Sequence, residues 1–162
     1  MISDSEKSEL ASSVNNSYLC LTILPTMQCN LRCVYCYEEH SNKHLSSYDV
    51  ENITKFIKNR NGTLKRLHIA WFGGEPLLKL KIVKNMLDEL KEFCTASGVD
   101  FTSSMVTNAT LLNISTFREL LSRNVKSFQI TFDGDEDIHD KLRFYVNGKG
   151  SFIDIWENLI SY

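Results

Sequence analysis

The chain has 162 residues, with 18 basic and 20 acidic side chains and a net charge of −2. This length suits one compact domain and is too short for two ordinary ones. The hydrophobic fraction of 43% and the charged fraction of 23% exclude wholesale disorder, collagen and coiled coil. The near-neutral charge gives no indication of nucleic acid or an anionic membrane as a partner.

The N-terminal region gives no sign of membrane insertion or export. Apolar runs such as residues 19–24 are far shorter than the ~20 residues that a membrane span needs. The first residues are polar, and no apolar segment typical of a signal peptide follows them. We therefore expect a cytoplasmic protein without a membrane partner. Residues 1–16 are expected to form a flexible leader, and residues 17–162 the domain.

The first half of the domain predicts two strands around one helix. Residues 18–24 form a short, apolar, β-branched run typical of a buried strand. After a Cys-rich loop, Ser46 or Ser47 can cap a helix that ends near Gly62. Residues 64–72 predict the second strand, which Gly73-Gly74 closes.

The second half repeats the pattern. A long helix with leucines at helical spacing is expected over residues 77–94, with Gly98 as its stop. A third strand is expected at residues 101–106, and Asn113 can cap the helix that follows. The fourth strand is expected at residues 125–132, closed by Asp133-Gly134, and Ser151 is expected to open the last helix.

The order is therefore β-α repeated four times. It predicts an α/β fold in which parallel strands are joined by crossovers, with the helices outside. Ligands bind such folds at the carboxyl ends of the strands. Four unusual segments of this chain each follow a predicted strand. They are the cysteines, Gly-Gly-Glu-Pro, Thr-Asn and Asp-Gly. We expect them to form one site.

Three of the five cysteines lie close together, as Cys29-Asn-Leu-Arg-Cys33-Val-Tyr-Cys36. This clustering indicates metal or redox chemistry rather than a disulfide framework. Three thiolates on one loop can hold three corners of an iron–sulfur cube and leave one iron open, which is typical of a reactive metal. The alternative is a zinc site completed by His40. The remaining two cysteines, Cys20 and Cys94, are expected to pack as small hydrophobes.

The spacing Cys-x3-Cys-x2-Cys, with Tyr35 before the third cysteine, resembles the signature of the radical S-adenosylmethionine (SAM) enzymes. Residues 72–76, Phe-Gly-Gly-Glu-Pro, resemble the Gly-Gly-Glu-Pro motif of that superfamily. Residues 107–112 resemble its Thr-Asn-Gly segment, with Ala109 where Gly is more usual.

Three later segments, residues 131–134, 138–143 and 148–152, resemble one subgroup. It contains the anaerobic sulfatase-maturating enzymes and the peptide-maturing enzymes with a C-terminal SPASM domain. The resemblance implies a (β/α)6-type partial barrel, of which this chain supplies about four β-α units. We therefore expect an N-terminal fragment, a truncated product or one part of a split protein.

The resemblance also implies the cofactors and the reaction. A [4Fe-4S] cluster held by Cys29, Cys33 and Cys36 would reductively cleave SAM to a 5′-deoxyadenosyl radical. That radical would modify a peptide or protein substrate. A low-potential electron donor of the flavodoxin or ferredoxin type would supply the electron. Two alternatives remain, namely an inactive remnant that binds the cluster or SAM without turnover, and a zinc-binding module.

The remaining site residues are implied to bind SAM. Gly73, Gly74 and Glu75 would hold its amino group, although by themselves they could form a plain turn that starts a helix at Pro76. Further contacts are implied for Thr131 and Arg143 with the carboxylate or ribose, for Tyr35 with the adenine, and for Asn108 as a residue facing the site. Asp133 and His139 are candidates for polar contacts near the site or for loop caps.

Overall fold

The computed structural model describes residues 3–7 and 16–161. Most of the expected leader, residues 1–2 and 8–15, lies outside the described residues. From residue 18 onward the chain alternates strands and helices as its sequence predicts.

A sheet of four parallel strands forms the centre of the fold. The strands are β1 (Tyr18–Ile23), β2 (Arg66–Trp71), β3 (Asp100–Val106) and β4 (Val125–Gln129). Their order in space, β1-β2-β3-β4, is also their order in the chain, and every neighbouring pair is parallel. Because all four strands point the same way, the segments that follow them meet at one edge of the sheet. The predicted partial-barrel arrangement of four β-α units is confirmed.

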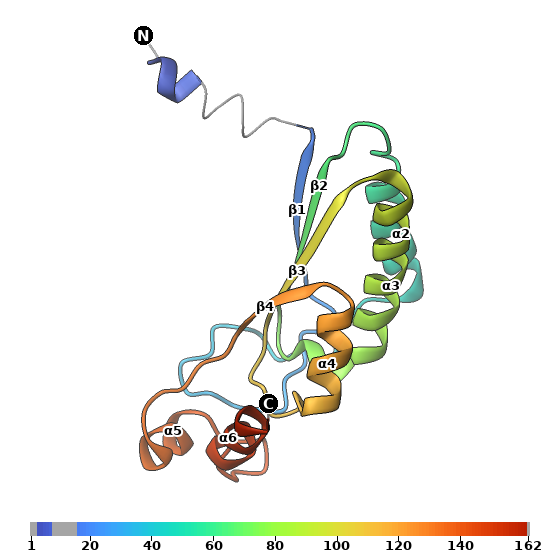
Figure 1. Ribbon diagram of the computed structural model, residues 1–162. Coiled ribbons are helices and arrows are strands. Elements are labelled where there is room, and N and C mark those ends of the chain that lie inside the picture. The colour runs from blue at the N-terminus through green and yellow to red at the C-terminus, as the bar shows by residue number, and fades with distance from the viewer. Residues whose placement is uncertain (1–2, 8–15, 162) are drawn as a thin grey trace.

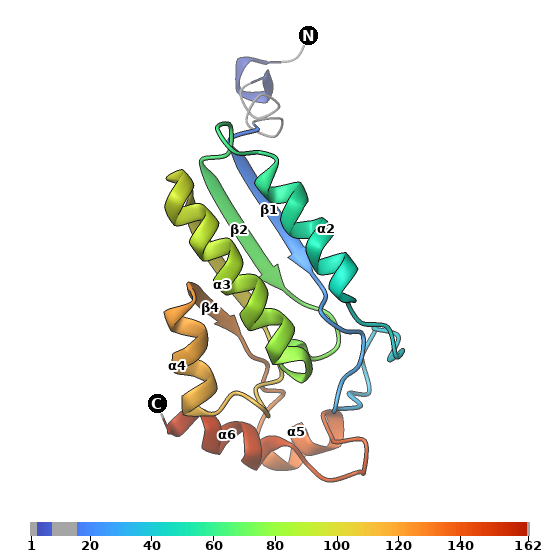
Figure 2. The same cartoon turned by 90° about the vertical axis from the view of Figure 1, so that its right-hand side faces the viewer.

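From residue 18 onward the helices are α2 (Ser47–Lys58), the 3₁₀ helix η1 (Pro76–Lys79), α3 (Leu80–Ser97), α4 (Ile114–Ser122), α5 (Glu136–Leu142) and α6 (Phe152–Ile160). Helices α2, α3 and α4 cover one face of the sheet, and no helix of the described residues covers the other (Figure 1). Helices α5 and α6 lie beyond the carboxyl ends of the strands (Figure 2). No helix among the described residues is long and apolar enough to cross a membrane.

The predicted helix signals act at their expected positions. Ser46 and Asp49 form a capping box at the start of α2. The Asn113 side chain accepts a hydrogen bond from the Thr116 amide at the start of α4. Gly98 ends α3 in the left-handed conformation, with a φ of 66°.

Several boundaries differ from the prediction by a few residues, three of them as follows. Helix α2 ends at Lys58, with Asn59 as its cap, and Gly62 lies in the turn beyond. The helix expected to begin at residue 77 is instead preceded by the 3₁₀ turn η1, which Glu75 caps. Strand β4 ends at Gln129 rather than at residue 132.

Helix α5 was not expected, because its seven residues offer too few apolar positions for a periodic pattern. A different signal was available. Asp135 caps the helix by accepting from the Ile138 amide, and Glu136 and Asp137 lie in its first turn. Ser151 does precede α6, but its side chain makes no capping bond. Asp140 caps α6 instead, accepting from the amides of Ser151 and Phe152.

The core lies between the sheet and the covering helices. On β2 the side chains of Leu67, Ile69 and Trp71 are buried, while those of Arg66, His68 and Ala70 are not. The uncovered face is therefore the more polar one. Cys94 packs in the core as predicted, but the same prediction is wrong for Cys20. Strand alternation leaves its thiol exposed in β1, the strand at one end of the sheet.

Candidate functional site

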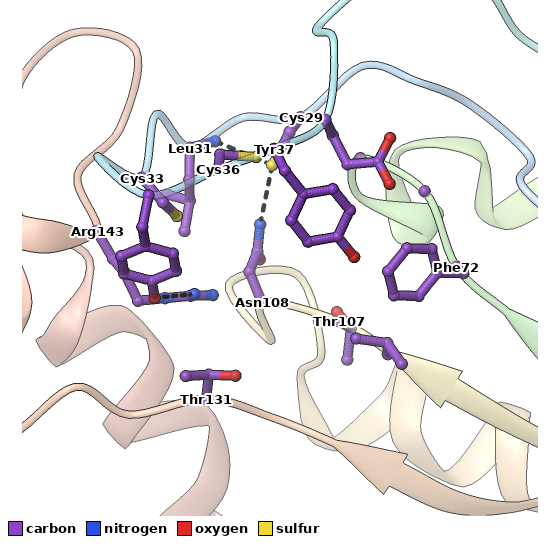
Figure 3. Close-up of a pocket in the computed structure, with 15 residues that line it drawn as sticks. Cys29, Leu31, Cys33, Cys36, Tyr37, Phe72, Thr107, Asn108, Thr131 and Arg143 are labelled. Carbon is purple, nitrogen blue, oxygen red and sulfur yellow. Dashed lines mark hydrogen bonds between the residues drawn. The ribbon is translucent and has the colours of Figure 1, made fainter.

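A pocket lies at the carboxyl ends of the strands, between the Cys-rich segment and the segments that follow β2, β3 and β4. It encloses about 670 Å³ of space not filled by atoms, part of it open to solvent. Nine of the ten predicted site residues line it, namely Cys29, Cys33, Cys36, Tyr35, Gly73, Gly74, Asn108, Thr131 and Arg143. Figure 3 shows the three cysteines, Asn108, Thr131 and Arg143 around this pocket.

The cysteine loop, residues 24–45, runs from β1 toward α2 and is fixed at both ends. Its two arms pair where Met27 donates to the Lys43 carbonyl and Leu45 to the Pro25 carbonyl. Within the cysteine loop, Arg32 donates to the Phe144 carbonyl, at 2.7 Å, and Val34 to the Leu142 carbonyl, at 3.0 Å. The segment after α5 therefore holds the cysteines in place.

The three thiols share this pocket but differ in their surroundings. Burial raises the pKa of the Cys29 thiol, and nearby Glu75 adds to this, while the Leu31 amide and Asn108 oppose it. Burial also raises the pKa of the Cys33 thiol, with Arg143 opposing. The Cys36 sulfur lies 3.8 Å from His40 Nε2. The thiols would have to lose their protons in order to bind a metal.

The thiols do not converge as the ligands of a single ion would. Among the described residues, no group of three or more His, Cys, Asp or Glu side chains is placed to hold one metal ion. A four-iron cube is wider than one ion, so its ligands stand farther apart around a common space. The three thiols line one pocket, and thiolates are the usual ligands of iron–sulfur clusters.

Gly73 and Gly74 pack against the cysteine loop. Gly74 donates to the Thr26 carbonyl, at 3.1 Å, and Glu75 to the Gln28 carbonyl, at 2.8 Å. A Cβ on Gly74 would overlap the Gln28 carbonyl, and one on Gly73 would come within 2.6 Å of the Thr26 carbonyl oxygen. Gly73 also has a φ of 109°. The absence of a Cβ at both positions therefore allows this segment to pack closely against the cysteine loop.

Glu75 is the one of these ten residues that does not line the pocket. Its side chain is fully buried, and its carboxylate accepts hydrogen bonds from the Leu77 amide, the Thr107 hydroxyl and the Asn108 amide. Burial raises its pKa above the ordinary value, although these donors oppose the effect. Glu75 therefore joins the end of β2, the start of η1 and the end of β3.

Arg143 is linked to Tyr35 and Asp133. Its Nη1 donates to the Tyr35 hydroxyl at 2.8 Å, and that hydroxyl donates to Asp133 Oδ2 at 2.5 Å. Arg143 Nε lies 3.9 Å from the same carboxylate oxygen. That nitrogen is buried, yet it has no hydrogen-bond acceptor among the described residues. Such a group is costly unless a ligand satisfies it. Arg143 is thus not a solvated charge: it is a mostly buried guanidinium that pairs with Tyr35 and Asp133 and lines the pocket.

His139 holds the backbone around this group. Its Nδ1 accepts from the Asp133 amide at 3.4 Å, and its Nε2 lies 3.1 Å from the Ser151 hydroxyl. Ser151 donates its only proton to the Arg143 carbonyl, so it accepts from His139 Nε2. His139 is therefore neutral, with its proton on Nε2. Burial and Arg143 lower its pKa.

Thr131 follows β4 and lies across the pocket from Cys29 and Cys36 in the view of Figure 3. Several lining residues were missed as candidates from the sequence, among them Tyr37, Glu38 and Phe72. Tyr37 and Glu38 directly follow Cys36, and Phe72 precedes Gly73. Their position next to the motifs in the sequence is the feature that could have identified them.

Comparison with known proteins settles the family. The family model described as the Radical SAM superfamily matches residues 23–161. The chain belongs to the radical SAM superfamily. Within it, the chain is 31% identical to the cysteine-type anaerobic sulfatase-maturating enzyme of Clostridium novyi, over 81% of this chain and 36% of that protein. It is 29% identical to the serine-type enzyme of Bacteroides thetaiotaomicron, over 81% of this chain and 33% of that protein.

The solved structure of native anSMEcpe with bound AdoMet and the Kp18Cys peptide has the same fold. It matches with a TM-score of 0.75 and 27% identity, over 89% of this chain and 40% of that one. AdoMet is S-adenosylmethionine. This radical SAM chain spans less than half the length of these relatives.

The donor set of the pocket fits the cofactors of this superfamily. Three thiols suit iron, and the buried Arg143 N–H without an acceptor suits a carboxylate such as that of AdoMet.

Proposed function

We propose that this chain carries the cluster-binding and AdoMet-binding part of a radical SAM enzyme that modifies a peptide or protein. The observation that carries the proposal is the convergence of three thiols and the buried Arg143 on one pocket. The peptide substrate is supported by the similarity to sulfatase-maturating enzymes and to anSMEcpe, whose structure holds a peptide.

In this proposal Cys29, Cys33 and Cys36 hold a [4Fe-4S] cluster. With AdoMet bound, the cluster supplies one electron that breaks a carbon–sulfur bond of the sulfonium, giving methionine and a 5′-deoxyadenosyl radical that takes a hydrogen atom from the substrate. The electron comes from a low-potential donor of the flavodoxin or ferredoxin type. The protein's own task is to orient these groups and to exclude side reactions.

The other lining residues hold AdoMet. The backbone of Gly73 and Gly74 borders the pocket and takes the amino group, while the buried Glu75 carboxylate holds the Leu77 and Asn108 amides beside it. Arg143 takes the carboxylate, because its unused N–H needs an anionic acceptor. Thr131 offers a hydroxyl to the ribose or carboxylate, and Tyr35 offers a ring for the adenine.

Anaerobic reconstitution with iron and sulfide tests the proposal. We expect a brown protein that contains iron and acid-labile sulfide and that forms 5′-deoxyadenosine from AdoMet and dithionite. The variant C33A should lose the cluster. The matched control C20A removes the exposed thiol of β1 and should keep it.

Other outcomes would point to the alternatives. Cluster colour without 5′-deoxyadenosine would indicate a remnant that binds but does not react. Zinc without iron or sulfide would contradict the proposal.

A further inference from the structure

Cys29 is set apart from the other thiols by two N–H groups that point at its sulfur. The Leu31 amide lies 3.4 Å from Cys29 Sγ, and Asn108 Nδ2 lies 3.6 Å from it. The second donor, Asn108, comes from the segment that follows β3 and points toward Cys29 (Figure 3). Both contacts are hydrogen bonds of the long kind that sulfur accepts.

The orientation of the Asn108 amide is fixed by a closed ring of hydrogen bonds. Asn108 Nδ2 donates to Asn30 Oδ1 at 2.9 Å, and Asn30 Nδ2 donates to Thr110 Oγ1 at 2.8 Å. Thr110 Oγ1 in turn donates to Asn108 Oδ1 at 2.7 Å. The Thr110 amide donates to the same oxygen at 3.0 Å. Because Oδ1 receives two donors, the amide nitrogen must face Asn30 and Cys29.

The backbone of Asn108 is held as well. Its amide donates to the buried Glu75 carboxylate at 2.8 Å. Asn108 itself is 6% exposed. A buried donor of fixed direction costs no reorganisation when the charge beside it changes.

Hydrogen bonds to the sulfurs are among the factors that set the potential of an iron–sulfur cluster. The reduced cluster carries one more negative charge than the oxidised one, so an N–H that points at a ligating sulfur favours the reduced state. We propose that Asn108 is a positioning residue that donates to the Cys29 thiolate and raises the reduction potential of the cluster. This inference rests on the cluster of the proposed function and adds a role for Asn108 that does not involve contact with AdoMet.

The test is a mediated redox titration of the reconstituted protein, followed by the EPR signal of the reduced cluster. The variant N108D keeps the acceptor that faces Thr110 and replaces the donor that faces Cys29 with a carboxylate oxygen. We expect a shift to more negative potential equivalent to at least a tenfold change in the reduction equilibrium, about 59 mV for one electron. N108A, which removes the donor without adding charge, should shift the potential in the same direction by less.

The matched control is N42D. Asn42 is exposed, and its Oδ1 accepts from Gln28, so an aspartate there adds the same charge and keeps that bond. The potential of N42D should equal that of the wild type. Titrations without AdoMet ensure that altered AdoMet binding cannot cause the shift.

Unchanged potentials in N108D and N108A, with intact clusters, would overturn the inference. Loss of the cluster from both variants, with native circular dichroism, would overturn it too, because Asn108 would then be needed to retain the cluster rather than to tune it. Absence of iron and sulfide from the wild type would instead contradict the proposed function.

Discussion

Arg143 combines burial, a free N–H and a place in the pocket. A hydrogen bond between charged groups contributes about 1.5–3 kcal/mol. A loss of ~1.4 kcal/mol of binding free energy weakens affinity tenfold. We therefore predict that R143Q weakens AdoMet binding to the reconstituted protein by roughly tenfold or more. Isothermal titration calorimetry measures the affinity, and iron content should stay unchanged. R118Q, which removes an exposed arginine of α4, is the control and should bind AdoMet as the wild type does.

His139 should make stability depend on pH. Burial lowers its pKa below the ordinary 6.5, Arg143 lowers it further, and Asp133 and Asp140 act in the opposite direction. The unfolded chain therefore takes up a proton near pH 6.5, while the folded chain does so only at lower pH. It follows that the free energy of unfolding decreases as the pH falls from 6.5 toward the folded-state pKa.

The variant H139Q cannot take up this proton. We predict that its unfolding free energy, measured with urea, changes less between pH 7.5 and pH 5.5 than that of the wild type. H44Q, which removes an exposed imidazole, should keep the wild-type slope. Parallel curves for the wild type and H139Q would show that His139 does not carry the dependence.

Spacing identified the three cysteines and most of the pocket lining, because those residues follow strands whose ends must meet. It did not show that Glu75 lies behind the pocket. That depends on donors from η1 and β3, which no local pattern in the sequence brings together. It also did not show the partners of Arg143, since Tyr35 and Asp133 come from other parts of the chain.

At the scale of elements, the cysteine loop is held between two segments. One follows β2 and contains Gly74, and the other, residues 142–146, begins at the last residue of α5. The second segment also carries Arg143. The thiols and the guanidinium are therefore placed by the same contacts, so a shift of either segment would disturb both.

A Cβ at position 74 should displace the cysteine loop, since it would overlap the Gln28 carbonyl. We predict that G74A binds less than half of the wild-type iron and unfolds about 1–3 kcal/mol more easily, the range typical of overpacking. G62A is the control. Residue 62 has a φ of 86°, which strains an alanine, but open space surrounds it. The G62A protein should therefore lose about 1 kcal/mol of unfolding free energy and keep its iron. Full iron content in G74A would contradict this account of the glycine.

The order of elements was predictable because strand and helix periodicities differ clearly in this chain. Helix α5 was not, since a seven-residue helix is carried by its cap and its contacts rather than by an apolar stripe. Cys20 shows the same limit. A short apolar run such as β1 does not reveal which of its two faces a helix will cover.

For the whole molecule, the described residues leave one apolar helix face open. Ile153, Trp156 and Ile160 of α6 lie three and four residues apart, on one side of the helix, and are 44%, 48% and 63% exposed. Strand β4 pairs only with β3 among the described strands, so its other edge is also unpaired. Apolar faces and open strand edges both favour association between molecules, and a net charge of only −2 resists it weakly.

We therefore predict that this chain self-associates as its concentration rises, and that the double variant I153K/I160K does so less. Sedimentation velocity over a range of concentrations measures the effect. The control Y48K/L121K adds the same two charges at exposed positions of α2 and α4, so it separates the loss of the apolar face from the change in charge. Equal association of both variants would assign the effect to charge alone. A wild-type chain that stays monomeric at all concentrations would show that the open face of α6 does not mediate association.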